Sequence, residues 1–295
     1  MRYKIITGDC EQFLKGEMSG RFDLTFLDPP FNQNKEYSMH NDDMLESEYW
    51  EWMNRVCDLV FKRTSEGGAI YFMQREKNAE FVLRALRQTG WTFQNLVIWK
   101  KKTSAIPSTK RFGKHHQIIV FATKGETPRV FNKLRVDPPL LANEKHRRPN
   151  GVYVTDVWAD IRELTSGYFA GDEPLRFENG ERVHKQQSPV KLLTRIILSS
   201  SNVGDMVFDP FAGTGTTLVA AKQLQRNSLG IELDPNNTSF IEDRLSQMRD
   251  SDNIQKCRND YIFTENLNDI FPLQALTGKI RQTQVQTGLE SYITA

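Results

Sequence analysis

The feature that most restricts the fold is the segment 207–233, in which a short apolar run leads through a glycine-rich loop into a helical pattern and a second apolar run. Gly213 and Gly215 allow the backbone to turn sharply and to approach a ligand closely. Glu232 stands near the end of the second run, nineteen residues after Gly213, where a carboxylate can reach the ribose hydroxyls of a bound nucleoside. A purely structural turn is the alternative, but strand, loop, helix, strand and acid together favour a nucleoside site.

Asp209 lies at the end of the first of these runs and restricts which nucleoside can bind. A pyrophosphate needs the positive end of the following helix without an opposing charge, so a carboxylate at this point disfavours a dinucleotide. The carboxylate attracts an ammonium instead, and S-adenosylmethionine carries an amino group and a sulfonium but no phosphate. The GxxxxGK[ST] loop that grips phosphates is also absent from the sequence. We therefore predict S-adenosylmethionine as the cofactor.

Short apolar runs alternate with helical periods along most of the chain. The runs that predict strands are residues 3–6, 22–27, 69–73, 93–99, 117–121, 206–208 and 228–233. The periods that predict helices are residues 47–63, 78–88, 216–224 and 237–248, with a further apolar helix after Pro189. This alternation predicts an α/β fold with a mostly parallel, doubly wound sheet and helices on both faces.

The alternation is lost between residues 125 and 183, where Gly, Pro, Asn and charged residues dominate and no long helix is predicted. We expect a small inserted recognition region there, between one half of the main domain at 1–124 and the other half at 184–250. Residues 251–295 are rich in Gln and Asn, and the sequence predicts neither a structure nor a role for this extension.

Positive charge is concentrated in one part of the chain. Residues 100–150 contain thirteen Lys or Arg and three Asp or Glu, whereas the whole chain has a net charge of only +2. A polyanion that docks on this stretch gains affinity from counterion release, whatever its sequence. A solvated basic loop without a partner is an equal alternative on charge alone.

Composition excludes several other classes of protein. No run of 18 apolar residues occurs, so the chain is not expected to span a membrane. The 18 Phe, 8 Tyr and 5 Trp are too many for a disordered chain. Cys10, Cys57 and Cys257 do not suggest a disulfide framework, and the N-terminus shows no secretory signal, so a reducing, cytoplasmic location is expected.

A second motif, Asp28-Pro29-Pro30-Phe31, directly follows the predicted strand 22–27. Two prolines fix two backbone torsions and remove two N–H donors, which leaves a rigid edge of carbonyls, a carboxylate and an aromatic ring. This set suits a planar base with an exocyclic amine. Asp28 and the Pro29 carbonyl can each accept one amine hydrogen, while Phe31 stacks on the ring. The amine nitrogen can then attack the methyl group of a sulfonium, with catalysis resting on placement and electrostatics.

Similar features elsewhere in the chain have a plainer interpretation. Asp137-Pro138-Pro139 repeats the first three residues but lacks the aromatic residue and follows no clean strand, so an ordinary turn is predicted there. A turn is also the alternative for Asp28, but the strand before it and the glycine loop elsewhere favour a site. The pair His115-His116 predicts no metal site, because adjacent strand residues point to opposite faces and no Cys or carboxylate cluster accompanies them.

Together these motifs resemble those of the DNA amino-methyltransferases, specifically the subgroup in which the catalytic motif precedes the cofactor motif. Asp28-Pro29-Pro30-Phe31 resembles their catalytic motif, and Asp209-Pro210-Phe211-Ala212-Gly213-Thr214-Gly215 resembles their cofactor motif. Gly8-Asp9-Cys10 resembles their adenine-end contact, and Val157-Trp158, His184 and Gln187-Ser188-Pro189 resemble the segment that leads into their cofactor half.

The resemblance covers about residues 1–250. It implies a circularly permuted, Rossmann-like methyltransferase sheet, a flipped target base and a target-recognition region at 125–183. The residues that it places at the cofactor are Asp9, Cys10, Asp28, His184, Ser188, Asp209, Phe211, Ala212, Gly213, Thr214, Gly215, Thr216, Thr217, Glu232 and Leu233. Ser188 stands where many members of the family have a lysine.

We therefore predict a site-specific DNA methyltransferase that transfers a methyl group from S-adenosylmethionine to an exocyclic amine. Adenine N6 is preferred because the Asp-Pro-Pro form of the motif more often accompanies adenine in this family; cytosine N4 is the alternative. The residues expected to contact double-stranded DNA are Lys101, Lys102, Lys110, Arg111, Lys114, Arg147 and Arg148. A catalytically inactive specificity module and a nicotinamide-dependent oxidoreductase are the alternatives from other classes, and a homodimer and a cognate restriction nuclease are open as partners.

Overall fold

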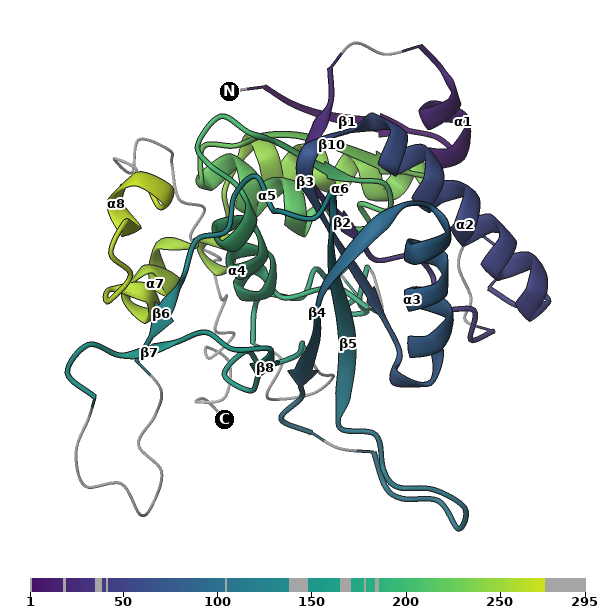
Figure 1. Cartoon of the computed structure of the whole chain (residues 1–295), viewed down its shortest axis with the longest axis horizontal. Coiled ribbons are helices and arrows are strands. Elements are labelled where there is room, and N and C mark those ends of the chain that lie inside the picture. The colour runs from purple at the N-terminus through teal and green to yellow at the C-terminus, as the bar shows by residue number, and fades with distance from the viewer. Residues whose placement is uncertain are drawn as a thin grey trace, which may run out of the picture.

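The computed structural model describes residues 2–17, 20–34, 39–40, 42–103, 105–137, 148–164, 171–177, 179–183 and 186–273. These residues build a central sheet of eight strands in the order β1-β10-β9-β2-β3-β5-β4-β8 (Figure 1). In that order, the strands are Tyr3–Thr7, Asn227–Glu232, Met206–Asp209, Phe22–Leu27, Thr64–Gln74, His116–Lys124, Trp91–Lys100 and Val157–Trp158. A two-stranded sheet pairs β6 (Arg135–Val136) with β7 (Val152–Tyr153).

Strands β1, β10, β9, β2 and β3, which are adjacent in that order, run parallel to one another. This confirms the mostly parallel α/β sheet predicted from the alternation. β5 runs antiparallel to both β3 and β4, a reversal that was not predicted. It arises because β4 and β5 are joined by a hairpin, described at residues 101–103 and 105–115 and called the 101–115 hairpin below, rather than by a crossover helix. At the centre of the sheet Thr25 of β2 lies opposite Phe208 of β9, so Asp28 and Asp209 emerge at the same edge.

Helices cover both faces of the sheet, as predicted (Figure 1). One face packs against α1 (Cys10–Lys15), α2 (Glu46–Arg63) and α3 (Ala79–Gln88). The other face packs against α4 (Val190–Ser200), α5 (Thr216–Gln223) and α6 (Pro235–Ser246). α1 was not predicted. In α2 the buried face includes the apolar stripe that the sequence period predicts, formed by Trp50, Met53, Val56, Cys57 and Val60.

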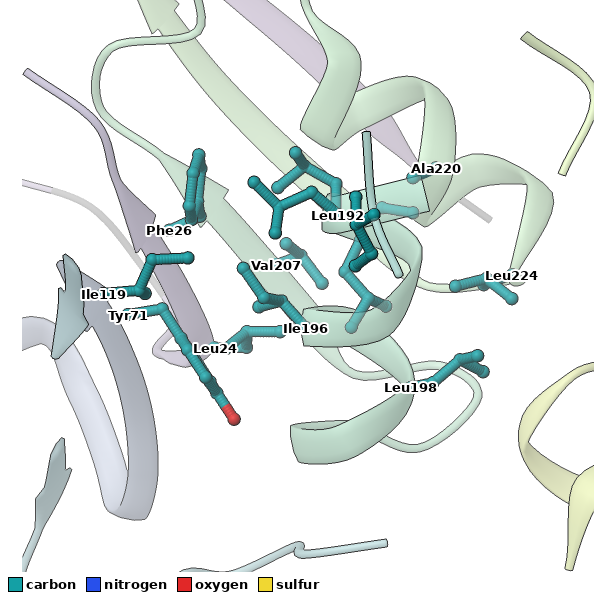
Figure 2. Close-up of a cluster of buried hydrophobic side chains, with 14 of the residues drawn as sticks. Leu24, Phe26, Tyr71, Ile119, Leu192, Ile196, Leu198, Val207, Ala220 and Leu224 are labelled. Carbon is teal, nitrogen blue, oxygen red and sulfur yellow. The ribbon is translucent and has the colours of Figure 1, made fainter. Parts of the chain in front are cut away.

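α4 lies at the junction of the two halves of the sheet, and 10 of its 11 residues are buried. Figure 2 shows Leu192 and Ile196 of α4 among side chains from strands on both sides of that junction, including Leu24 of β2 and Val207 of β9. Each such fully buried aliphatic side chain contributes about 1.5–3 kcal/mol of hydrophobic stabilisation. This cluster therefore binds the two halves into one core.

β3 begins at Thr64, five residues before the start that the sequence predicts. The prediction was wrong because Gly67-Gly68 stands between the predicted helix at 47–63 and the predicted strand at 69–73, and a glycine pair favours an end of regular structure. In the structure these glycines lie within the strand, where the partner of Phe22 is Thr64 but the partner of Leu24 is Ala69. The pair therefore forms a bulge in β3, a common use of glycine inside a strand.

Residues 250–271 pack against α4 and α5, although the sequence predicts no structure for them. They form the short helices α7 (Gln255–Arg258) and α8 (Leu267–Ile270), and Tyr261 and Phe271 are fully buried in the main core. The buried guanidinium of Arg226 donates hydrogen bonds to the carbonyl oxygens of Ser201 and Ile270, at 2.8 and 2.6 Å. None of the helices in the described ranges has both the length and the hydropathy that a membrane span requires.

Candidate active site

One cleft at the carboxyl ends of β1, β2, β9 and β10 is lined by both sequence motifs. Asp28, Pro29 and Pro30 form one part of its wall, and residues 209–214 form another. The cleft is open to solvent and has a volume of about 1060 Å³. Two distant stretches of the chain thus share a cavity, and the open edge of an α/β sheet is where ligands of such folds bind.

The glycine loop has the tight geometry that its sequence predicts. Gly215 has φ +76°, and a Cβ added to it would lie 2.8 Å from two side-chain carbons of Ile241. The backbone N–H of Gly215 donates to the Ala212 carbonyl at 2.7 Å, and α5 begins at the next residue. Glycine is therefore required here both for its backbone torsion and for the close approach of α6.

Asp209 is buried at the base of this loop. Its carboxylate accepts hydrogen bonds from the Phe211 backbone N–H at 3.0 Å and from the Thr217 hydroxyl at 2.6 Å. Burial nevertheless raises the pKa of Asp209 to about 7, because removal from water disfavours the charged form more than these bonds favour it. A cation that enters the cleft beside Asp209 would stabilise its ionised form.

Glu232, at the end of β10, closes the loop from the opposite side. Its carboxylate accepts hydrogen bonds from the backbone N–H groups of Gly213 at 2.7 Å and Asp234 at 3.0 Å, and from the Asn237 amide at 3.1 Å. Burial raises the pKa of Glu232 above its ordinary value. The acid predicted to reach a ribose therefore lines the same cleft as the glycine loop and is held in place by it.

Asp9 and Cys10 line the cleft from β1 and α1. The Asp9 carboxylate caps α1 by accepting a hydrogen bond from the Gln12 backbone N–H at 2.8 Å. Burial raises the pKa of the Cys10 thiol well above its ordinary value, so this residue lines the cleft as a neutral group. Gly8 joins the ends of β1 and β10, because its N–H donates to the Glu232 carbonyl at 2.8 Å.

The Asp28-Pro-Pro-Phe turn is held rigidly by residues that the sequence analysis did not identify as part of a site. The Tyr49 hydroxyl donates to the Pro30 carbonyl at 2.8 Å and accepts from the Gln74 amide at 3.0 Å. The Asp42 carboxylate accepts the backbone N–H of Asn32 at 2.8 Å, just after the turn. Tyr49 lies within the predicted helix at 47–63 and Asp42 in a polar run before it, so neither role had a signal in the sequence.

Ser188 reaches Asp28 from the other half of the chain. Its hydroxyl donates to one carboxylate oxygen of Asp28 at 3.1 Å. Both residues line the cleft described above and also a second cavity of about 730 Å³. Phe31, Trp99 and Lys101 line this second cavity, so Asp28 stands at the boundary between two adjoining cavities.

The second cavity has a rigid wall built from the base of the 101–115 hairpin. The Glu163 carboxylate accepts the backbone N–H groups of Lys102 at 2.8 Å and Thr103 at 2.9 Å. The ammonium of Lys101 lies 5.4 Å from the centre of the Trp99 ring. Burial lowers the pKa of Lys101, opposed by the nearby negative charges of Glu163 and Asp28. The cavity thus combines aromatic surface with charged groups.

The structure places most of the predicted cofactor residues together. The cleft is also lined by Phe211, Ala212, Thr214, Thr216, Thr217 and Leu233. Gly215, also predicted as a cofactor residue, is buried and does not line the cleft. Trp52, which was not predicted, also lines it and contacts the Phe211 ring edge-on, with ring centres 5.5 Å apart. The predicted cofactor residue His184 lies outside the described residues.

The residues predicted to bind DNA are spread over more than one environment. Lys102, Lys110, Arg111 and Arg148 are exposed. Lys114 forms an ion pair with Glu76 at 3.1 Å, and Lys101 lies in the second cavity rather than on the surface. Arg147 lies outside the described residues. In the described part of the chain, no group of three or more His, Cys, Asp or Glu side chains is arranged to hold a metal ion.

Comparison with known proteins identifies relatives of this chain. It is 28% identical to the Type II methyltransferase M.BamHI of Bacillus amyloliquefaciens over 82% of its own length, but this covers only 56% of that protein. It is 27% identical to the Type II methyltransferase M.HpaI of Haemophilus parainfluenzae over 88% of its own length and 81% of the relative.

Solved structures share the fold at low identity. The M1.HpyAVI–SAM complex matches with a TM-score of 0.56 and 23% identity, covering 82% of this chain and 98% of that one. The cytosine-N4-specific PvuII DNA methyltransferase matches with a TM-score of 0.60 and 17% identity, covering 91% and 94% of the two chains. These matches confirm the methyltransferase type of α/β fold.

A model of the DNA methylase family N6_N4_Mtase matches residues 22–243, a range that contains the Asp28 turn, the second cavity and the glycine loop. The match confirms the resemblance to DNA amino-methyltransferases that the two motifs indicated. The chain belongs to the N6_N4_Mtase family of DNA methylases.

Proposed function

We propose that this chain binds S-adenosylmethionine in the cleft of the glycine loop and methylates the exocyclic amine of a base in double-stranded DNA. The observation that carries the proposal is the position of Asp28, whose side chain lines both the cleft and the adjoining second cavity. A cofactor in the cleft and a base in the second cavity would meet at this carboxylate. The solved M1.HpyAVI complex contains SAM, which supports the choice of cofactor.

The residues of the cleft suit this cofactor chemically. Asp209 supplies a buried carboxylate for the ammonium group, and Glu232 supplies carboxylate oxygens for the ribose hydroxyls. Phe211 and Trp52 provide aromatic surface at the same cleft. When bound, S-adenosylmethionine supplies an electrophilic methyl group.

At the boundary between the two cavities, the chain positions the amine for attack. Of the two proline carbonyls, that of Pro30 accepts the Tyr49 hydroxyl, so the Pro29 carbonyl and the Asp28 carboxylate are the acceptors for the amine hydrogens. Phe31 stacks on the base. Asp28 would accept the proton that the amine nitrogen loses when the nitrogen–methyl bond forms and the bond from that methyl group to the cofactor sulfur breaks, with the bonding electrons remaining on sulfur. The gain comes from orientation and from negative charge at the developing cation.

Adenine N6 is the proposed target, with cytosine N4 as the alternative. The preference rests on the Asp-Pro-Pro form of the motif, as argued from the sequence. The similar PvuII DNA methyltransferase is cytosine-N4-specific, so the alternative is tested on equal terms. We also propose that residues 125–183 contribute to recognition of the target sequence, beside the exposed cations Lys110 and Arg111.

The test is incubation with labelled S-adenosylmethionine and duplex DNA, followed by mass spectrometry of the nucleosides. N6-methyladenine is expected; N4-methylcytosine would move the assignment to the alternative base. D28A should abolish transfer while calorimetry shows that cofactor binding is retained. D137A, in the other Asp-Pro-Pro sequence, is the matched control: it lies in the region proposed for recognition, so any loss should appear in DNA affinity, and kcat should stay at the wild-type value.

Three results would contradict the proposal. Full activity of D28A would mean that the assigned turn does not carry the reaction. Binding of NAD instead of S-adenosylmethionine would favour an oxidoreductase. Binding of DNA by the wild-type chain without any methyl transfer would favour an inactive specificity module.

A further inference from the structure

The 101–115 hairpin projects from the edge of the sheet that carries the two cavities (Figure 1). Its arms are joined by hydrogen bonds from the Ala105 N–H to the Lys114 carbonyl at 2.9 Å and from the Ser108 N–H to the Arg111 carbonyl at 3.1 Å. At Gly113 the arms approach so closely that an added Cβ would lie 1.9 Å from the Ala105 carbonyl oxygen. The described part of the hairpin is therefore a paired structure with a defined end.

Two large apolar side chains are almost fully exposed near the end of this hairpin. Ile106 is 92% exposed and Phe112 is 94% exposed, the highest values among the exposed large hydrophobic residues in the described ranges. Lys110 and Arg111, also exposed, directly precede Phe112 in the chain. Covering an aromatic side chain of this kind lowers the free energy because it removes apolar surface from water. The adjoining cations favour a polyanion as the covering partner.

The base of the same hairpin belongs to the second cavity. Lys101 and Thr103 line it together with Asp28, and the Glu163 carboxylate fixes the backbone at Thr103. DNA that delivers a base to this cavity must therefore pass beside the hairpin. Extrusion of a base costs a few kcal/mol of stacking and pairing and leaves a gap in the duplex. Apolar side chains that enter the stack offset such costs in other DNA-binding proteins.

We propose that Phe112 is an apolar wedge that enters the stack of the duplex at the position vacated by the target base, with Ile106 as a second apolar contact from the opposite arm. Lys110 and Arg111 pair with the flanking phosphates. The inference rests on the proposed function, since it assumes that the base in the second cavity comes from duplex DNA. It adds a role for the hairpin in extrusion that is separate from the chemistry at Asp28.

The target sequence is first identified by methylation-sensitive sequencing of DNA treated with the wild-type protein. The test then compares Phe112→Ala with the wild type on two duplexes that contain this sequence. One duplex is fully paired, and the other has a mismatch at the target base, so its unpairing cost is already reduced. F112A should bind the paired duplex about tenfold or more weakly and should lose the fluorescence rise of 2-aminopurine at the target position. On the mismatched duplex the defect should shrink to a few-fold, because the wedge is needed less.

Two further variants separate the wedge from other effects. Phe93→Ala removes an aromatic side chain that is 53% exposed on β4 and should leave binding unchanged. Lys110→Ala should weaken binding to both duplexes equally and reduce the salt dependence, whereas F112A should leave the salt dependence unaltered. Retention of cofactor binding by F112A shows that the fold is intact.

The outcomes distinguish the two proposals. If the wild-type chain transfers no methyl group to DNA, the proposed function fails. If the wild type is active but F112A binds and flips like it, the wedge is wrong and the function stands. An equal defect of F112A on paired and mismatched DNA would also overturn the wedge, since it would indicate a simple surface contact.

Discussion

Tyr49→Phe tests whether the rigidity of the Asp28 turn contributes to catalysis. The substitution removes one oxygen atom from a buried side chain and leaves its ring in place. The Pro30 carbonyl then loses its hydrogen bond of 2.8 Å, and the Gln74 amide loses its acceptor at 3.0 Å. The Gln74 side chain is fully buried, and the Pro30 carbonyl belongs to the turn that holds Asp28.

The magnitude follows from the two groups that are left unpaired. Each buried polar group without its partner costs about 1–3 kcal/mol, so Y49F, which leaves two such groups, should lower the free energy of unfolding by about 2–6 kcal/mol. The effect on turnover is separate: a proline carbonyl released from Tyr49 allows the turn to move, and displacement by about 1 Å can cost about 100-fold in rate. We expect kcat for methyl transfer to fall between about 10- and 100-fold.

Tyr71→Phe is the matched control. Tyr71 is also a buried tyrosine, and its hydroxyl is hydrogen-bonded to the Ser200 hydroxyl at 2.7 Å, away from the Asp28 turn. Y71F should lose about 1–3 kcal/mol of stability with little change in kcat. Thermal denaturation and single-turnover transfer assays measure the two effects. The reasoning is refuted if Y49F keeps the wild-type kcat, or if Y71F loses as much kcat as Y49F.

Three further outcomes follow from buried groups around the cofactor loop. Because burial raises the pKa of Asp209 to about 7, calorimetry should show weaker S-adenosylmethionine binding as the pH falls below that value, and Asp209→Asn should abolish this dependence; an unchanged pH profile would contradict the assignment. In thermal denaturation, Gly215→Ala should cost about 1–2 kcal/mol for its positive φ and about 1–3 kcal/mol more for its clash with Ile241. Gly204→Ala, with φ +88° and open space around it, should cost only the first amount, and equal costs would exclude the clash. Asp252→Asn breaks a buried ion pair and should cost about 3–5 kcal/mol, while Asp250→Asn, in an exposed pair, should cost about 0.5 kcal/mol or less; similar melting temperatures would refute this.

The sign of the Asp209 effect differs between binding and folding. A carboxyl whose pKa is raised in the folded state binds more protons there than in the unfolded chain. Its contribution therefore lowers the stability of the ligand-free fold as the pH rises from about 4 to about 7, the range between its ordinary and its raised pKa. Binding of a cation beside Asp209 reverses the trend, so the bound protein should gain relative stability over the same range.

The parts of the fold that sequence reasoning predicts are those with a strong local signal. The helical stripe of α2 and the strand, loop and helix around Gly213 and Gly215 follow from periodicity and from glycine chemistry, and both are confirmed. The direction of β5 and the continuation of β3 through Gly67-Gly68 were missed, because each depends on which strand lies next to it in the sheet. Pairing of this kind is a tertiary property that short apolar runs do not encode.

The candidate site divides in the same way. Asp28 and Asp209 could be identified because each is a carboxylate at the end of an apolar strand, directly before a proline or glycine motif. Tyr49 and Gln74 could not, because a tyrosine on a helix face and a glutamine in a strand are ordinary until their hydrogen bonds to the turn are known. The role of residues 250–271 was also missed, since polar composition hid the few apolar side chains that dock on α4.

The burial of α4 has a consequence for how this chain could be divided. A helix with almost no solvent-facing residue cannot remain dissolved without both of the surfaces that cover it. If the chain is divided before Pro189, the N-terminal fragment lacks the helix that fills its core. The C-terminal fragment exposes the apolar side chains of α4 to water. We therefore expect the two pieces to aggregate when made apart and to recover a native assembly only when synthesised together.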